Sequence, residues 1–254
     1  MKQQEFLLEN YSSFNLRDIF ECGQCFRWNK EEDGSYTGVF ANNVINVSKT
    51  TKGIYFKGVC EKDIVNTVID YFDLDRDYNK IKRILAKVDN NMKESIKYGE
   101  GIRILNQDLW ETIISFIISA NNNIPRIKGI IERLSKKYGK KIEFNNKKYY
   151  TFPTVEELKD VSVEEYRELG LGFRDIRLYE TTKMILNKDV DISKLNEIKD
   201  TNQVRDELLK LSGVGPKVAD CILLFSTLKR FDVFPIDVWV RRVMNDLYIH
   251  KEDE

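Results

Sequence analysis

The hydrophobic pattern of the chain changes its period near Glu61, and this change constrains the fold more than any other feature. Before it, short aromatic and β-branched runs alternate with turn signals, which is typical of antiparallel strands. After it, apolar residues recur every three or four positions, which is typical of helices. We therefore expect an α+β protein, with an antiparallel β-rich domain and flanking helices over residues 1–95 and an all-α domain over residues 96–254. The predicted strands are CFRW, SYTGVFA, VINVSK and GIYFKGV.

The helical part contains one segment that is apolar on almost every side. Residues 108–119 (DLWETIISFIIS) therefore predict a central buried helix. Residues 124–139 predict a helix with Ile124, Ile127 and Ile131 on one face and several cations on the other. A brief strand candidate near KKYYTF is the exception to the helical pattern after Glu61.

Composition and charge exclude some classes of function. Lys+Arg and Asp+Glu both number 41, so the chain has no net charge, and binding to a nucleic acid would have to rest on local patches. The longest apolar stretch, TIISFIISA, is too short to span a bilayer, and MKQQEFLLEN lacks the blocks of a secretory signal. We expect a cytoplasmic protein without a membrane partner.

Four cysteines raise the question of a metal or redox site. They are Cys22, Cys25, Cys60 and Cys221, and the only histidine is His250. A structural zinc site needs four ligands, usually as two close pairs, and this chain offers one such pair. A redox dithiol is expected at the start of a helix, whereas CFRW reads as a strand. We therefore predict no metal site.

The stretch ELLKLSGVGPKVADC predicts two helices joined by a tight turn. Gly213 and Gly215 permit positive φ values, and Pro216 suits the first position of the second helix. Outward N–H groups at such a helix–hairpin–helix attract a phosphate. The alternative from the residues alone is an ordinary corner between two helices.

Lys217 and Cys221 follow this turn, four residues apart on one helix face. The helix macrodipole and an apolar wall both favour an uncharged amine at Lys217, the form that can build a Schiff base. The alternatives are a surface lysine and a core cysteine. Asp237, in VFPIDVW, is placed to cap the next helix, and it could also face a developing cation.

These motifs carry a resemblance that runs over almost the whole chain. LSGVGPKVADC followed by PIDVW resembles the helix–hairpin–helix/Gly-Pro-Asp superfamily of DNA base-excision glycosylases. With GQCFRW, SANNNIPRI and LGLGFRDIRLY, the chain is similar to the 8-oxoguanine DNA glycosylase/AP lyases of that superfamily. The resemblance implies a monomer that flips 8-oxoguanine out of double-stranded DNA, opposite cytosine, excises it and cleaves the strand by β-elimination. It implies no cofactor.

The resemblance also implies roles for single residues. Lys217 would attack the sugar C1′, and Asp237 would stabilise the positive charge that develops there. The Gly23 carbonyl would accept a hydrogen bond from N7–H of 8-oxoguanine, a position where guanine has an acceptor instead. Cys221 would pack on the flipped base, and Phe225 would line either the base pocket or only the core. Read alone, Gly23 is a turn glycine before a strand.

A second group would contact the duplex. Asn121 would fill the gap left by the flipped base, Arg126 and Arg174 would read the orphaned cytosine, and Phe173 would be an aromatic wedge beside it. Without the resemblance, Asn121 ends a helix and both arginines are solvated charges. The hairpin residues that would hold a DNA phosphate through their backbone are Gly213, Val214 and Gly215.

The chain departs from the family pattern at three points. Phe173 replaces the usual tyrosine, and Trp239 replaces a histidine found in many relatives. Relatives also usually continue into a helix that supplies an aromatic stacker and an amide to the base pocket, so the sequence leaves the closure of this pocket open. Two other functions stay open: a glycosylase for another damaged base, and a non-catalytic DNA-binding module. Lys217 counts against the first, and Lys217 with Asp237 against the second, because a phosphate clamp needs neither.

Overall fold

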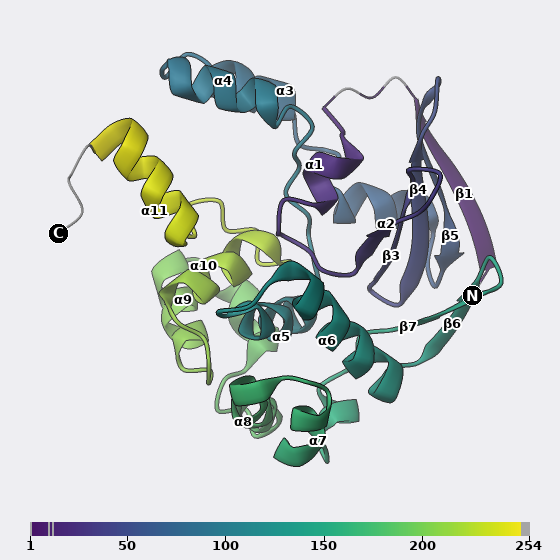
Figure 1. The fold of residues 1–254 in the computed structure, drawn as a ribbon, viewed down its shortest axis with the longest axis vertical. Helices are drawn as coiled ribbons and strands as arrows, with labels where there is room; N and C mark the ends of the chain where they lie inside the picture. The colour runs from purple at the N-terminus through teal and green to yellow at the C-terminus, as the bar shows by residue number, and fades with distance from the viewer. Residues whose placement is uncertain (1, 10, 12, 250–254) are drawn as a thin grey trace.

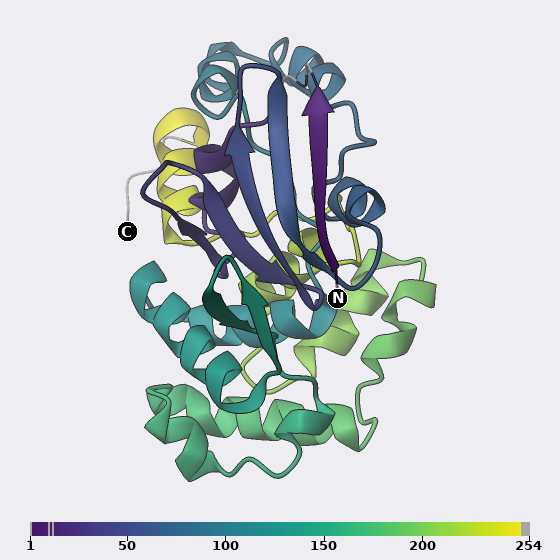
Figure 2. The same cartoon turned by 90° about the vertical axis from the view of Figure 1, so that its right-hand side faces the viewer.

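The computed structural model describes residues 2–9, 11 and 13–249, so that His250 lies outside the described residues. Its N-terminal part is a five-stranded antiparallel sheet in the order β1-β5-β4-β3-β2 (Figures 1 and 2). The strands are β1 (Lys2–Glu9), β2 (Trp28–Lys30), β3 (Tyr36–Phe40), β4 (Asn43–Lys49) and β5 (Gly53–Cys60).

Three of the four predicted strands are confirmed, and the first, CFRW, is wrong. Cys25, Phe26 and Arg27 form no strand, and β2 begins at Trp28. All four side chains are buried, so no face of this segment can meet solvent as a half-buried strand would. Phe26 packs in the core of the helical part, whereas Cys25 and Trp28 pack in the core of the sheet.

An aromatic core attaches helices α1 (Leu16–Phe20) and α2 (Ile64–Tyr71) to the sheet. Trp28 stacks on Phe20 with ring centroids 4.1 Å apart, and its indole N–H donates to the Tyr71 hydroxyl over 2.9 Å. Gly38 on β3 faces this indole, and a Cβ there would lie 2.3 Å from it. The segment that starts at Gly23 is therefore attached to the sheet through Trp28.

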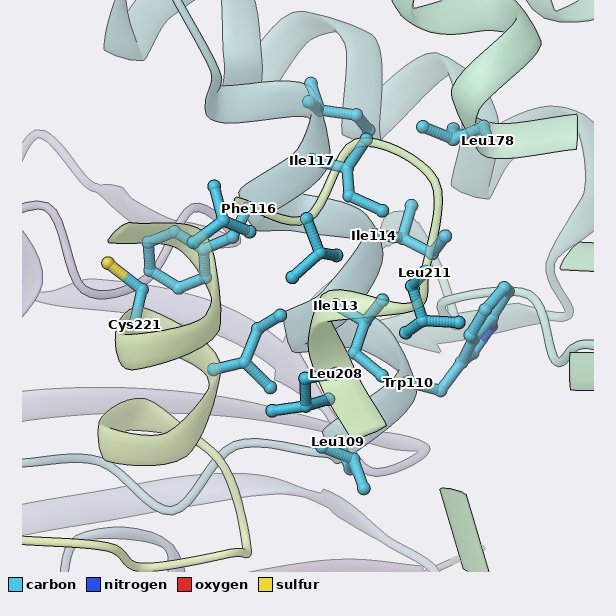
Figure 3. Close-up of a cluster of buried hydrophobic side chains, with 14 of the residues drawn as sticks. Leu109, Trp110, Ile113, Ile114, Phe116, Ile117, Leu178, Leu208, Leu211 and Cys221 are labelled. Atoms are coloured by element: carbon cyan, nitrogen blue, oxygen red, sulfur yellow. The ribbon is translucent and has the colours of Figure 1, made fainter. Parts of the chain in front are cut away.

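The helical part is built around α5 (Leu109–Ser119), which confirms the predicted central helix. Nine of its side chains are buried, and Figure 3 shows them packed between α9 and α10. The prediction for α6 (Ile124–Tyr138) is wrong at Ile124, which is exposed because it lies before the turn of α6 that reaches the core. The other helices are α3 (Tyr78–Leu85), α4 (Asn90–Tyr98), α7 (Val163–Glu168), α8 (Asp175–Leu186), α9 (Thr201–Leu209), α10 (Pro216–Phe225) and α11 (Val238–Met244).

The strand candidate near KKYYTF is confirmed as β7 (Lys147–Tyr150), which pairs with β6 (Lys141–Phe144). Ile142 and Phe144 of this hairpin pack on the sheet, so the two parts of the molecule adjoin here as well. The predicted α+β class is confirmed, and the boundary between residues 95 and 96 stays a prediction. Within the described residues, every helix is too short or too polar to span a membrane.

Candidate active site

The turn between α9 and α10 is the predicted helical hairpin. Gly213 has φ +83°, as expected, but Gly215 has φ −97°, so the expectation of a positive φ there is wrong. Gly215 instead caps α10, and Pro216 is the first helical residue. The Val214 N–H donates to the Leu211 carbonyl over 3.1 Å, whereas the N–H groups of Gly213 and Gly215 have no acceptor among the described residues. Two backbone donors of this turn are thus free for a ligand.

Lys217 lies in the first turn of α10 against an aromatic wall. Its Nζ is 5.4 Å from the ring centroid of Phe116, a buried residue of α5. The ammonium also lies within hydrogen-bonding reach of the Cys221 thiol, on the same face of α10. Burial raises the pKa of this thiol, the Lys217 charge opposes that rise, and the charge of Asp237 adds to it. The amine and the carboxylate thus both act electrostatically on the Cys221 thiol.

Asp237 is the N-cap of α11, as predicted. Its side chain accepts a hydrogen bond of 2.8 Å from the Val240 N–H, which fixes the carboxylate at the start of the helix. Its neighbour Trp239 is exposed, and the guanidinium of Arg242 lies 5.2 Å from its ring centroid. Asp237 remains partly exposed.

Phe116 is the centre of the apolar surface beside Lys217, and sequence reasoning missed it. The ring of Phe225 stacks on it with centroids 5.8 Å apart, and Phe26 meets it edge-on at 5.6 Å. Figure 3 shows Cys221 on α10 beside the ring of Phe116. A flat ligand entering between Lys217 and Phe225 would meet aromatic and sulfur surface.

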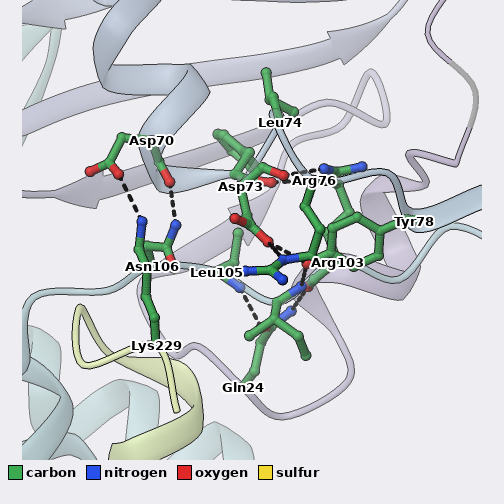
Figure 4. Close-up of polar contacts among 12 residues, drawn as sticks. Gln24, Asp70, Asp73, Leu74, Arg76, Tyr78, Arg103, Leu105, Asn106 and Lys229 are labelled. Atoms are coloured by element: carbon green, nitrogen blue, oxygen red, sulfur yellow. Dashed lines mark hydrogen bonds and ion pairs between the residues drawn. The ribbon is translucent and has the colours of Figure 1, made fainter. Parts of the chain in front are cut away.

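Gly23 has the backbone geometry that favours glycine. Its φ is +86°, and no heavy atom lies within 4 Å of a Cβ built there, so the backbone is open to a ligand. The next residue, Gln24, is 1% exposed. Its amide donates to the carbonyls of Ile19 (2.9 Å) and Arg103 (2.8 Å) and accepts from the Leu105 N–H (3.0 Å). Figure 4 shows this contact between Gln24 and Leu105.

Gln107 connects the Gly23 segment to α10. Its side-chain amide donates to the carbonyls of Gln24 (2.7 Å) and Phe225 (3.2 Å). Its backbone accepts from the Thr227 N–H over 2.8 Å and donates to the same Phe225 carbonyl. The segment of Gly23 and the helix of Lys217 are thus tied to one residue. We call Gly23, Lys217, Cys221, Phe225 and Asp237 the reaction cluster.

The three asparagines after α5 have separate roles. Asn121 has φ +49° and an exposed side chain, Asn122 donates to the Ile118 carbonyl over 3.0 Å, and Asn123 caps α6. Arg174 fixes this loop, because its guanidinium donates to the carbonyls of Ala120 (2.9 Å) and Asn121 (2.7 Å). The reading of Arg174 as a solvated charge is wrong, since it is 1% exposed.

Phe173 and Arg126 lie beside the same loop. Phe173 is 55% exposed, and its ring centroid is 4.2 Å from the Arg174 guanidinium. Arg126, on α6, donates to the Gly170 carbonyl over 3.2 Å. The residues of the loop cluster are Asn121, Arg126, Phe173 and Arg174. Phe173 and Arg174 thus adjoin the loop of Asn121, and Gln107 ties the Gly23 segment to α10, which carries Lys217.

The cysteine pair beside Gly23 lies in surroundings that disfavour thiolates. All four cysteines are free, and burial raises the pKa of the Cys22 and Cys25 thiols. This disfavours the thiolate that redox chemistry needs. A cavity of about 580 Å³ lies elsewhere, lined by Asp70, Asn106 and Thr227 among others, and none of the predicted site residues lines it.

Two family models together match nearly the whole chain. The 8-oxoguanine DNA glycosylase N-terminal domain matches residues 6–113, and the HhH-GPD superfamily base excision DNA repair protein matches residues 114–254. The N-glycosylase/DNA lyase of Saccharomyces cerevisiae is 32% identical over 263 residues, which cover 92% of this chain and 68% of that protein. The chain belongs to the 8-oxoguanine DNA glycosylase family.

Other members of this family are similar over long stretches. A probable N-glycosylase/DNA lyase of Methanothermobacter thermautotrophicus is 35% identical over 201 residues, 71% of this chain and 63% of that protein. The chain thus spans 63% and 68% of the length of these two curated relatives. The Clostridium acetobutylicum 8-oxoguanine glycosylase/lyase, in complex with double-stranded DNA containing cytosine opposite 8-oxoguanine, is 41% identical with a TM-score of 0.93. That match covers 100% of this chain and 88% of the other.

Proposed function

We propose that the protein is a bifunctional DNA glycosylase/AP lyase that excises 8-oxoguanine from duplex DNA. The observation that carries this proposal is the reaction cluster. The amine of Lys217 lies against the buried ring of Phe116. The carboxylate of Asp237, fixed by its cap bond, acts electrostatically on the Cys221 thiol. A phosphate clamp without catalytic activity needs neither group. Relatives named N-glycosylase/DNA lyase support the same function.

The chemistry assigned to this cluster has two stages. The bond between C1′ and the base breaks, the base leaves with the electron pair, and Asp237 stabilises the positive charge that develops on the sugar. The uncharged amine of Lys217 bonds to C1′, and opening of the sugar ring gives an iminium. Loss of a proton from C2′ then expels the 3′ phosphate. Water hydrolyses the iminium and regenerates the amine.

Recognition of the base is assigned to the carbonyl of Gly23. 8-Oxoguanine has an N7–H donor, whereas guanine has a lone pair there. A carbonyl that accepts from this N–H would face a second acceptor in guanine, and the unmade hydrogen bond is costly in a dry pocket. Cys221 and Phe225 would supply the surfaces on which the flipped base packs. The open space around Gly23 supports this role.

Contact with the duplex is assigned to the loop cluster and the hairpin. Asn121, exposed and in the left-handed region, would enter the gap left by the flipped base. Phe173 would wedge beside it, while Arg126 and Arg174 would read the orphaned cytosine. Because Arg174 is buried and bonds two loop carbonyls, we propose that it reads the cytosine only when DNA binding shifts this loop. The backbone N–H groups of Gly213 and Gly215 in the hairpin would bind a DNA phosphate. We propose that one monomer binds one duplex.

Strand incision on five duplexes tests the function. Four of them carry 8-oxoguanine opposite each of the four normal bases, and the fifth contains guanine opposite cytosine. We expect base release and β-elimination on the lesion, fastest opposite cytosine, and none on guanine. Binding without release or incision on any of these duplexes would contradict the proposal, and it would favour a DNA-binding module or a glycosylase for another damaged base.

A further inference from the structure

Arg177 lies between the loop cluster and the hairpin, and no role has been assigned to it so far. It is the third residue of α8. Its stem packs against Gly213, since a Cβ built on that glycine would lie 2.8 Å from Cδ of Arg177. Its guanidinium carbon lies 5.2 Å from the ring centroid of Phe173. One side chain therefore spans from the hairpin to the exposed aromatic ring.

The charge around Arg177 is positive and uncompensated. Burial lowers the pKa of Arg174, and the charges of Arg126 and Arg177 lower it further, so both neighbouring guanidinium groups repel that of Arg174. The ion pairs of the described residues include none for Arg177. The two carboxylates of its own helix nearby are engaged, because Asp175 pairs with Arg167 at 2.7 Å and Glu180 accepts from the Ser212 hydroxyl.

We propose that Arg177 binds a backbone phosphate of DNA between the hairpin and Phe173. This proposal rests on the proposed function, because it takes duplex DNA as the ligand. A phosphate there would relieve the repulsion among the three arginines and would accept from the Arg177 fork. Gly213, the residue on which the Arg177 stem packs, has a free N–H that can complete the site. Such a contact positions the duplex without reading its sequence.

The test compares Arg177→Gln with Lys183→Gln, which removes the same charge from the same helix. Lys183 is a matched control because its ammonium lies near Tyr179 and donates to the Lys159 carbonyl. Affinities for an undamaged duplex and for one with a stable abasic analogue are measured from low to moderate salt. We expect Arg177→Gln to bind both about tenfold more weakly, with the slope of log affinity against log salt smaller by about one. Lys183→Gln should behave as wild type.

Two further measurements separate a phosphate contact of Arg177 from a purely structural role and from the proposed substrate. Arg177→Lys should restore the salt slope, because the charge remains, whereas a purely structural role for Arg177 would leave the slope unchanged in all variants. Slopes that coincide for Arg177→Gln and wild type would overturn the proposal even if 8-oxoguanine incision is intact. Failure of wild type to incise 8-oxoguanine, with the slope difference present, would overturn the proposed substrate and leave the phosphate contact standing.

Discussion

At the scale of single residues, Gly23 has the most specific requirement. Its φ of +86° disfavours any L side chain, yet the space around it is empty. A substitution there would strain the backbone without a clash inside the protein, at a cost of about 1–2 kcal/mol. A base can approach the backbone closely here because glycine has no side chain to fill this open space.

Gly23→Ala is therefore expected to impair recognition more than folding. The new methyl group would occupy the approach to the carbonyl, and the selectivity for 8-oxoguanine over guanine should fall by about tenfold or more. Single-turnover excision of both bases, with a melting curve beside it, measures the two effects. A Gly23→Ala variant as selective as wild type would exclude the carbonyl of this residue as the lesion reader.

Glu111 on α5 is a buried carboxyl whose ionisation should affect stability. Its Oε2 lies 3.9 Å from Nη1 of Arg27, which has no hydrogen-bond partner among the described residues. Burial raises the pKa of Glu111 from 4.5 to about 7, against the opposing charge of Arg27. The folded protein thus holds a proton that the unfolded chain releases near pH 4.5.

The contribution of Glu111 to stability should be complete below pH 4.5 and should be lost as pH rises to 7. The folded state binds more protons in this window, so the unfolding free energy of wild type relative to Glu111→Gln should fall by about 1.4 kcal/mol per pH unit. Urea unfolding of both proteins at several values between pH 4 and about 8 measures this. A difference independent of pH would contradict the assignment.

At the scale of elements, Gln107 determines how the Gly23 segment sits against α10. It bonds carbonyls of both, and its backbone pairs with the residues after α10. A mutation here removes bonds between elements, and the only group of the reaction cluster that Gln107 bonds among the described residues is the backbone carbonyl of Phe225. The relative placement of Gly23 and Lys217 is the property that should change.

Gln107→Met keeps the size of the side chain and removes both bonds. We expect a loss of about 1–3 kcal/mol of stability, because the Gln24 carbonyl loses its donor and the Phe225 carbonyl keeps only the Gln107 backbone N–H. Excision of 8-oxoguanine should slow more than cleavage at a preformed abasic site, which needs Lys217 and no base reading. Parallel single-turnover assays on the two substrates test this, and equal slowing of both would refute the positioning role.

At the scale of the whole molecule, the sequence predicts what depends on local spacing. The turn at Gly213, the shared helix face of Lys217 and Cys221, and the cap at Asp237 all follow from residues within a few positions of one another. The amide of Gln24 bonds a residue 81 positions away, and Gln107 bonds one 118 positions away. Pairings of this kind depend on how the two domains pack, which no periodicity encodes.

The same limit explains the errors at CFRW and Arg174. The run from Cys25 to Trp28 has strand-like residues, but its side chains divide between the cores of both domains, and the strand begins only at Trp28. Arg174 has the sequence context of a surface charge, yet the loop after α5 folds over it and supplies carbonyl acceptors. In both cases tertiary packing overrides the local pattern.

The central claim is that Lys217 forms a Schiff base with the sugar of an excised 8-oxoguanine, and borohydride trapping tests it most directly. The protein is incubated with an end-labelled duplex containing 8-oxoguanine opposite cytosine, in the presence of borohydride. The account predicts a covalent protein–DNA adduct for wild type and none for Lys217→Gln, which should still bind the duplex. An adduct formed by Lys217→Gln at the wild-type rate would contradict it.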